Sequence, residues 1–119
     1  MAQRLRQRRG LSRVAGPHEL LEAAAARIGA PPLRAPVRPR VGVDLGTASC
    51  VLVVLDGPRP VWVAAAGSGA LADGVVVDFA RAVATVRALR EQAQDALGVE
   101  LVRTATAYPP CIPVADSRA

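Results

Sequence analysis

Asp44 is the side chain whose type and setting most suggest chemistry, because it lies near the end of an apolar run and just before a tight turn. The turn holds residues that could approach an anion closely or donate hydrogen bonds to it: Gly46, Thr47, Ala48 and Ser49. A carboxylate beside a phosphate would hold Mg²⁺ through water or orient an attacking water, since two anions repel each other. We therefore take Asp44 as the candidate catalytic residue and indirect metal ligand, and the turn as the candidate phosphate cradle.

The same residues also fit an ordinary β-hairpin with a glycine-containing loop, which needs no ligand. Spacing alone favours this simpler interpretation. The order of the residues is more informative: a strand, Asp-Leu-Gly-Thr, a turn, Ser and a second strand. That order resembles the first phosphate motif of the superfamily that contains actin, sugar kinases and DnaK-type chaperones.

Within that superfamily the chain is most similar to the ethanolamine-utilisation protein EutJ family. The resemblance continues through Asp73–Phe79, which reads Asp-Gly-Val-Val-Val-Asp-Phe, and through Ala105–Pro110, which reads Ala-Thr-Ala-Tyr-Pro-Pro. It covers roughly residues 40 to 110. The hairpin motif is shared across the superfamily, whereas these two blocks point to the one family.

The resemblance implies an α/β fold, an incomplete actin-like (ribonuclease H-like) ATPase lobe. It also implies ATP and Mg²⁺ as cofactors, with Asp44 positioning the metal and water and the turn from Gly46 to Ser49 holding the phosphates. The implied role is that of a chaperone in ethanolamine utilisation in the bacterial cytoplasm. Its partners would be enzymes of that process or proteins of the associated microcompartment.

The chain departs from the family in what it lacks. Family members carry a second phosphate hairpin, Asp-Gly-Gly-Gly-Thr, and a later Gly-Gly adenosine loop, and this sequence has neither. Residues 41–110 are therefore expected to be the first part of an actin-like domain, followed by a truncated tail at 111–119. Such a chain would be inactive alone as an ATPase. The alternative from another class is a non-enzymatic module that binds a microcompartment or enzyme partner.

The strands are predicted from alternating apolar residues. Val41–Leu45 and Ser49–Leu55 form an antiparallel hairpin, and Arg59–Ala66 adds a third antiparallel strand with Trp62 as its anchor. A loop over Gly67–Gly74 follows and leads to a short apolar segment.

A crossover helix is predicted next, capped by Asp78 and ended by Gly98. Its apolar positions recur at helical spacing and should face the sheet: Phe79, Val83, Val86, Leu89, Ala93 and Leu97. Val99–Ala107 then returns as the fourth strand, and Pro109 stops it.

The positive charge is concentrated at the start of the chain. Residues 1–40 hold nine arginines and two glutamates, a net charge of +7, whereas residues 41–119 hold six arginines and eight acids, a net charge of −2. We expect a disordered basic tail at 1–15, a short helix at 16–29 and a stiff, proline-rich linker at 30–40. The tail lacks interleaved aromatic residues for base stacking, which argues against a nucleic-acid partner.

The short helix has two open interpretations. Its apolar residues share one face: Leu20, Leu21, Ala24 and Ile28. A helix of this kind on a proline-rich tether resembles the amphipathic peptides that dock enzymes onto microcompartment shells. It could equally pack on its own domain. His18 at its start is expected to be an exposed polar residue.

Other chemistries are excluded or weak. The chain has no lysine, so a Walker-type phosphate loop is ruled out. Gly67–Ala72 fits a loose dinucleotide fingerprint, but the β-branched residues that follow argue against the required helix. Cys50 and Cys111 lack the partners of a zinc site or a thiol nucleophile. No run reaches the ~20 apolar residues of a membrane helix.

Overall fold

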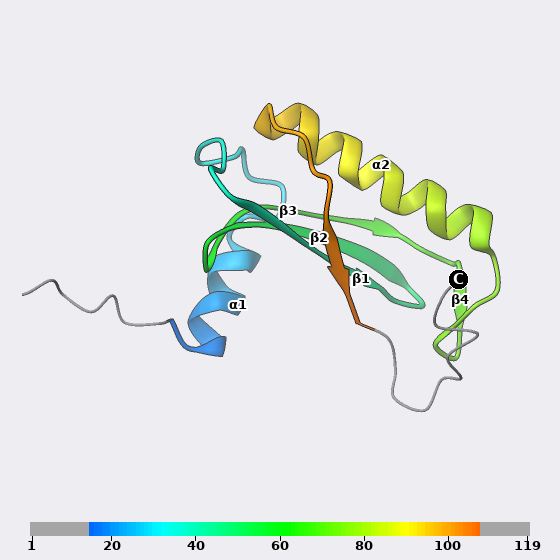
Figure 1. The fold of residues 1–119 in the computed structure, drawn as a ribbon. Coiled ribbons are helices and arrows are strands. Elements are labelled where there is room, and N and C mark those ends of the chain that lie inside the picture. Colours follow the sequence, from blue (N-terminus) through cyan, green and yellow to red (C-terminus); the bar gives the residue numbers. More distant parts are fainter. Residues whose placement is uncertain (1–14, 108–119) are drawn as a thin grey trace, which may run out of the picture.

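The computed structural model describes residues 15–107, which are built around a four-stranded sheet (Figure 1). The strands are β1, Pro39–Leu45; β2, Ser49–Asp56; β3, Arg59–Gly67; and β6, Thr104–Thr106. Their order is β3-β2-β1-β6, with β6 parallel to β1 and the other pairs antiparallel. The helices are α1, Pro17–Ala25, and α2, Phe79–Leu97. The predicted α/β fold, with three antiparallel strands, a crossover helix and a fourth strand, is confirmed.

Strand alternation separates the two faces of the sheet. In β2, Cys50, Leu52 and Val54 are buried, while the residues between them are partly exposed. Val41 and Val43 of β1 belong to the same buried cluster, beneath α2. Each fully buried aliphatic side chain contributes about 1.5–3 kcal/mol, so this face carries most of the stabilising burial.

Helix α2 begins and ends where the sequence predicts. The Asp78 carboxylate accepts the Arg81 N–H at 2.9 Å, and Gly98 ends the helix in the left-handed region with φ 66°. The buried helix positions are Ala82, Leu89, Ala93 and Leu97. The prediction that Phe79 faces the sheet is wrong, since its side chain is 58% exposed. Phe79 lies on the flank of α2, where it lines a groove with Leu45 and Val76.

The predicted fourth strand, Val99–Ala107, is too long. Only Thr104–Thr106 pairs with β1. The preceding residues are held against α2 instead, because Leu101 is 3% exposed and its N–H donates to the Gln94 side chain at 2.9 Å. The loop predicted at Gly67–Gly74 also differs, since it contains most of a small hairpin.

That small hairpin consists of β4, Leu71–Ala72, and β5, Val75–Val76. Its turn residues, Asp73 and Gly74, have φ values of 50° and 79°. Two positive φ values at an Asp-Gly pair are typical of the type I′ turn that joins short antiparallel strands.

Helix α1 packs on its own domain. It contacts β3, and Figure 1 shows it on the other side of the sheet from α2. The helix was expected to reach Gly29 but ends at Ala25, because the next turn tightens: the Ile28 N–H bonds to the Ala25 carbonyl three residues earlier. Ile28 then forms a parallel bridge with Val63.

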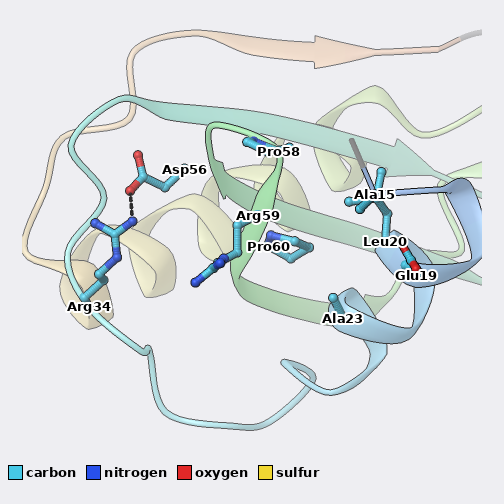
Figure 2. Close-up of a pocket in the computed structure, with 9 residues that line it drawn as sticks. All are labelled: Ala15, Glu19, Leu20, Ala23, Arg34, Asp56, Pro58, Arg59 and Pro60. Carbon is cyan, nitrogen blue, oxygen red and sulfur yellow. Dashed lines mark ion pairs between the residues drawn. The ribbon is translucent and has the colours of Figure 1, made fainter. Parts of the chain in front are cut away.

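The segment between α1 and β1 is tied to the sheet through Asp56 (Figure 2). The Asp56 carboxylate lies 2.6 Å from the Arg34 guanidinium and accepts the Arg38 N–H at 3.1 Å. Its side chain is only 9% exposed. Pro36 is also buried, so this proline-rich segment is fixed against the domain at two points.

Candidate functional site

Asp44 lies on the face of the sheet opposite the core. Its neighbours Val43 and Cys50 are buried, whereas Asp44 is exposed and pairs in register with Val51 across β2. The carboxylate is therefore open to solvent, one residue before the end of β1. A charged group in this position can meet a hydrated metal ion without the desolvation cost of a buried site.

Gly46 is required by the turn itself. Its N–H donates to the Ser49 carbonyl at 2.9 Å, and a Cβ built on Gly46 would lie 3.0 Å from that same oxygen. A side chain here would push against backbone rather than against a movable group. Gly46 thus allows the tight turn between β1 and β2.

The carbonyls of the turn are held from one side. The N–H groups of Ser68 and Gly69 donate to the carbonyls of Ala48 and Thr47, at 3.1 and 3.3 Å. In a trans peptide the N–H points opposite to the carbonyl of the same unit, and the described chain contains no cis bond. The Ala48 and Ser49 N–H groups therefore point away from the Ser68–Gly69 loop, where they can meet an anion.

The loop that holds the turn also holds the start of α2. The Ala70 carbonyl accepts the N–H groups of Val77 and Asp78, at 2.9 and 3.2 Å. Ser68 is 6% exposed, and its hydroxyl accepts the Ala70 N–H at 3.3 Å. The candidate cradle is thus connected to the helix by continuous hydrogen bonds.

Arg81, which pairs with Asp78 at 3.7 Å, lies beside the loop that bonds the turn, and this position was not predicted from the sequence. Gly69 has φ 63°, and a Cβ built there would lie 2.9 Å from an Arg81 guanidinium nitrogen. Arg81 therefore places a cation beside the loop that bonds the turn. Arg81 is in the first turn of α2, and nothing in the sequence indicates that this turn lies beside Gly69.

The cysteine beside the cradle carries no chemistry. Cys50 is fully buried, and burial together with the nearby charge of Asp44 raises the pKa of its thiol. A protonated, buried thiol is a poor nucleophile, as the sequence predicted. Cys111 lies outside the described residues. Between residues 15 and 107, no group of three or more His, Cys, Asp and Glu side chains could hold a metal directly.

The loose dinucleotide fingerprint at Gly67–Ala72 does not have the context it needs. The residues after it form β4 and β5 rather than a helix. The helix that this fingerprint requires directly after its glycines is therefore absent. In the described part of the chain, no helix is long and apolar enough to cross a membrane.

Comparison with known proteins agrees with the α/β fold described above. A crystal structure of ethanolamine utilization protein EutJ from Carboxydothermus hydrogenoformans matches with a TM-score of 0.68 and 40% sequence identity, covering 73% of this chain and 32% of that one. The ethanolamine utilization proteins EutJ of Salmonella typhimurium and Salmonella typhi are each 36% identical over 91 residues, which is 76% of this chain. No protein-family model matches.

The three antiparallel strands, the crossover helix and the parallel fourth strand define the opening lobe of an actin-like ATPase fold. The chain belongs to the EutJ family. It spans about a third of the length of the relatives it matches.

Proposed function

We propose that this chain is an EutJ-like protein of ethanolamine utilisation, and that the turn from Gly46 to Ser49 contacts the phosphates of a bound nucleotide. The observation that carries the proposal is that hydrogen bonds from the Ser68–Gly69 loop hold the turn in one orientation. Two of its carbonyls are bonded from one side, which directs the Ala48 and Ser49 N–H groups outward. The family relationship supplies the class of ligand.

The residues present suit the phosphate end of Mg·ATP. The exposed Asp44 carboxylate would orient a metal-bound water or an attacking water, and the turn N–H groups would hold phosphate oxygens. When bound, Mg·ATP supplies the phosphoryl group and the metal charge that stabilises its transfer.

This chain supplies one side of such a site. Phosphoryl transfer depends on groups placed around the whole phosphate chain, and the described residues bring one carboxylate and one turn. We expect the purified chain to bind Mg·ATP at best in the millimolar range, about −4 kcal/mol. We expect no measurable hydrolysis.

Titration of the full chain with Mg·ATP, followed by phosphorus NMR and by calorimetry, tests this proposal. Asp44→Asn should remove the magnesium-dependent part of the binding. Asp95→Asn, which changes an exposed acid on α2, is the matched control and should bind as the wild type does. Equal binding by Asp44→Asn and Asp95→Asn would contradict the assignment. Turnover that Asp44→Ala abolishes would show a more complete site than we propose.

A second candidate function is docking to a microcompartment protein through α1. The observation in its favour is that α1 contains no buried residue, and that Leu21 is 70% exposed although α1 contacts β3. A partner could cover Leu21 without displacing the helix from its own domain.

The full chain fused to a fluorescent protein should then concentrate in microcompartments of a host that makes them. Leu21→Asp should disperse the signal, because a charge on the exposed apolar face opposes burial. Ala23→Asp, an exposed position on a different face of the same helix, is the control. Diffuse fluorescence of the wild-type fusion would eliminate docking.

A further inference from the structure

A cationic hollow lies at the opposite end of β1 from Asp44. Its volume is about 470 Å³, and it is formed where β1 and β6 begin. Three arginines line it, Arg38, Arg40 and Arg103, together with Thr104 and residues next to them. We call it the arginine hollow.

Strand register brings two of these arginines together. Val41 pairs with Thr104 in the parallel ladder between β1 and β6, so Arg40 and Arg103 are the residues just before the first pair. Val41 is buried on the side of α2, and strand alternation places Arg40 on the other face. Arg103, the residue just before β6, is thus level with Arg40 of β1, and both residues line the hollow.

These cations have no counter-ion in the described part of the chain. Asp56, which pairs with Pro39 in the β1–β2 register, is engaged by Arg34 at 2.6 Å and by the Arg38 backbone at 3.1 Å. The ion pairs found between residues 15 and 107 involve none of the three guanidiniums, and no acidic residue lines the hollow. Like charges on adjacent strands are destabilising unless something neutralises them.

We propose that the arginine hollow binds a small anion with two or more negative charges, either a phosphate or a polycarboxylate. Guanidinium groups present paired donors that match both phosphate and carboxylate oxygens. The volume is in the range of small-molecule sites. No aromatic residue lines the hollow, so a stacked base of single-stranded nucleic acid has no platform there.

The arginine hollow is separate from the candidate phosphate cradle at Gly46–Ser49. Asp44 and Arg40 lie toward opposite ends of one seven-residue strand, which spans about 3.3 Å per residue. An anion in the arginine hollow therefore does not occupy the turn from Gly46 to Ser49. The two sites can be tested in the same protein by different substitutions.

The test is calorimetric titration of the full chain, at constant ionic strength, with phosphate, diphosphate and citrate. We expect saturable binding with one anion per chain. The double variant Arg40→Gln, Arg103→Gln should weaken it by about tenfold or more, because both charge-assisted contacts are lost. The double variant Arg87→Gln, Arg90→Gln removes the same charge from exposed positions on α2 and should bind within about twofold of wild type. Asp95→Asn, at an exposed position of α2, should leave the affinity unchanged.

The preferred ligand identifies the source of the anion. Tighter binding of diphosphate would indicate a phosphate compound, and tighter binding of citrate would indicate a polycarboxylate. The proposal would be overturned by the absence of saturable binding up to about 10 mM, or by equal losses in the two double variants. Retention of the chain on DNA without binding of any small anion would also overturn it. Circular dichroism of each variant checks that the fold is intact.

Discussion

The two ends of β1 hold charge in different ways. At the Asp44 end, backbone hydrogen bonds from Ser68 and Gly69 fix the turn, and the donors that face outward are peptide groups without net charge. At the Arg40 end, side-chain charges are gathered by strand register alone and have no acidic partner in the described chain. The turn at the Asp44 end is therefore preorganised without ligand. At the Arg40 end the arginine charges repel one another, so the folded chain should become more stable when an anion binds there.

The largest expected effect comes from weakening the packing of α2 on the sheet, which supports both ends of β1. Leu89, a buried residue of α2, is 1% exposed. Leu89→Ala should lower the free energy of unfolding by about 2–5 kcal/mol, through lost burial and a residual cavity. Urea unfolding followed by circular dichroism measures it, with the exposed neighbouring substitution Arg90→Ala as control. A loss below about 1 kcal/mol would show that α2 contributes little to holding the sheet.

Gly46→Val should disrupt the turn at the Asp44 end of β1 and leave the arginine hollow at the other end intact. The added Cβ meets the Ser49 carbonyl oxygen at 3.0 Å, so the turn must open at a cost of about 1–3 kcal/mol. We expect loss of Mg·ATP binding with anion binding by the arginine hollow retained. Gly67→Ala, where a Cβ meets no atom within 4 Å, is the control. Loss of both activities would mean that the two ends are coupled.

Asp56 should make stability depend on pH at the arginine end. The Arg38 N–H and the Arg34 guanidinium hold the pKa of Asp56 below its ordinary 3.8. The folded carboxylate therefore binds protons less readily than the unfolded one. Its contribution to stability is fully present above the unfolded pKa and is lost as pH falls through the folded pKa.

Thermal unfolding of wild type and Asp56→Asn from pH 7 to pH 2 measures this contribution. The difference in melting temperature should be largest at neutral pH and should shrink at the acid end. Asp95→Asn on α2 serves as control. A constant difference across the series would contradict a role for the Asp56 charge.

The smallest expected effect is a gain in stability. Arg40→Glu would place opposite charges on neighbouring strands beside Arg103, which stabilises by about 0.2–1 kcal/mol. The variant should melt slightly higher than wild type in the absence of anion and should no longer be stabilised by phosphate. Arg87→Glu, on an exposed part of α2, is the charge-matched control. A lower melting temperature for Arg40→Glu would show that the arginines do not repel each other in the free chain.

The sequence by itself determined the elements whose signals are local. Helix α2 begins at Asp78 and ends at Gly98 as predicted, because a cap is decided by a residue and its neighbours within one turn. The three antiparallel strands follow from alternation, and their turns are short. The β4–β5 hairpin was missed although its Asp73-Gly74 pair is also a local turn signal.

Only the tertiary structure decided which distant residues meet. β6 is short because Leu101 packs against α2 instead of continuing the ladder, and a β-compatible sequence cannot reveal that competition. Arg81 reaches Gly69 through the path of the β4–β5 hairpin, and Arg103 reaches Arg40 through a parallel pairing across more than sixty residues. Strand register depends on the packing of the whole sheet, so neither juxtaposition is encoded in any local pattern.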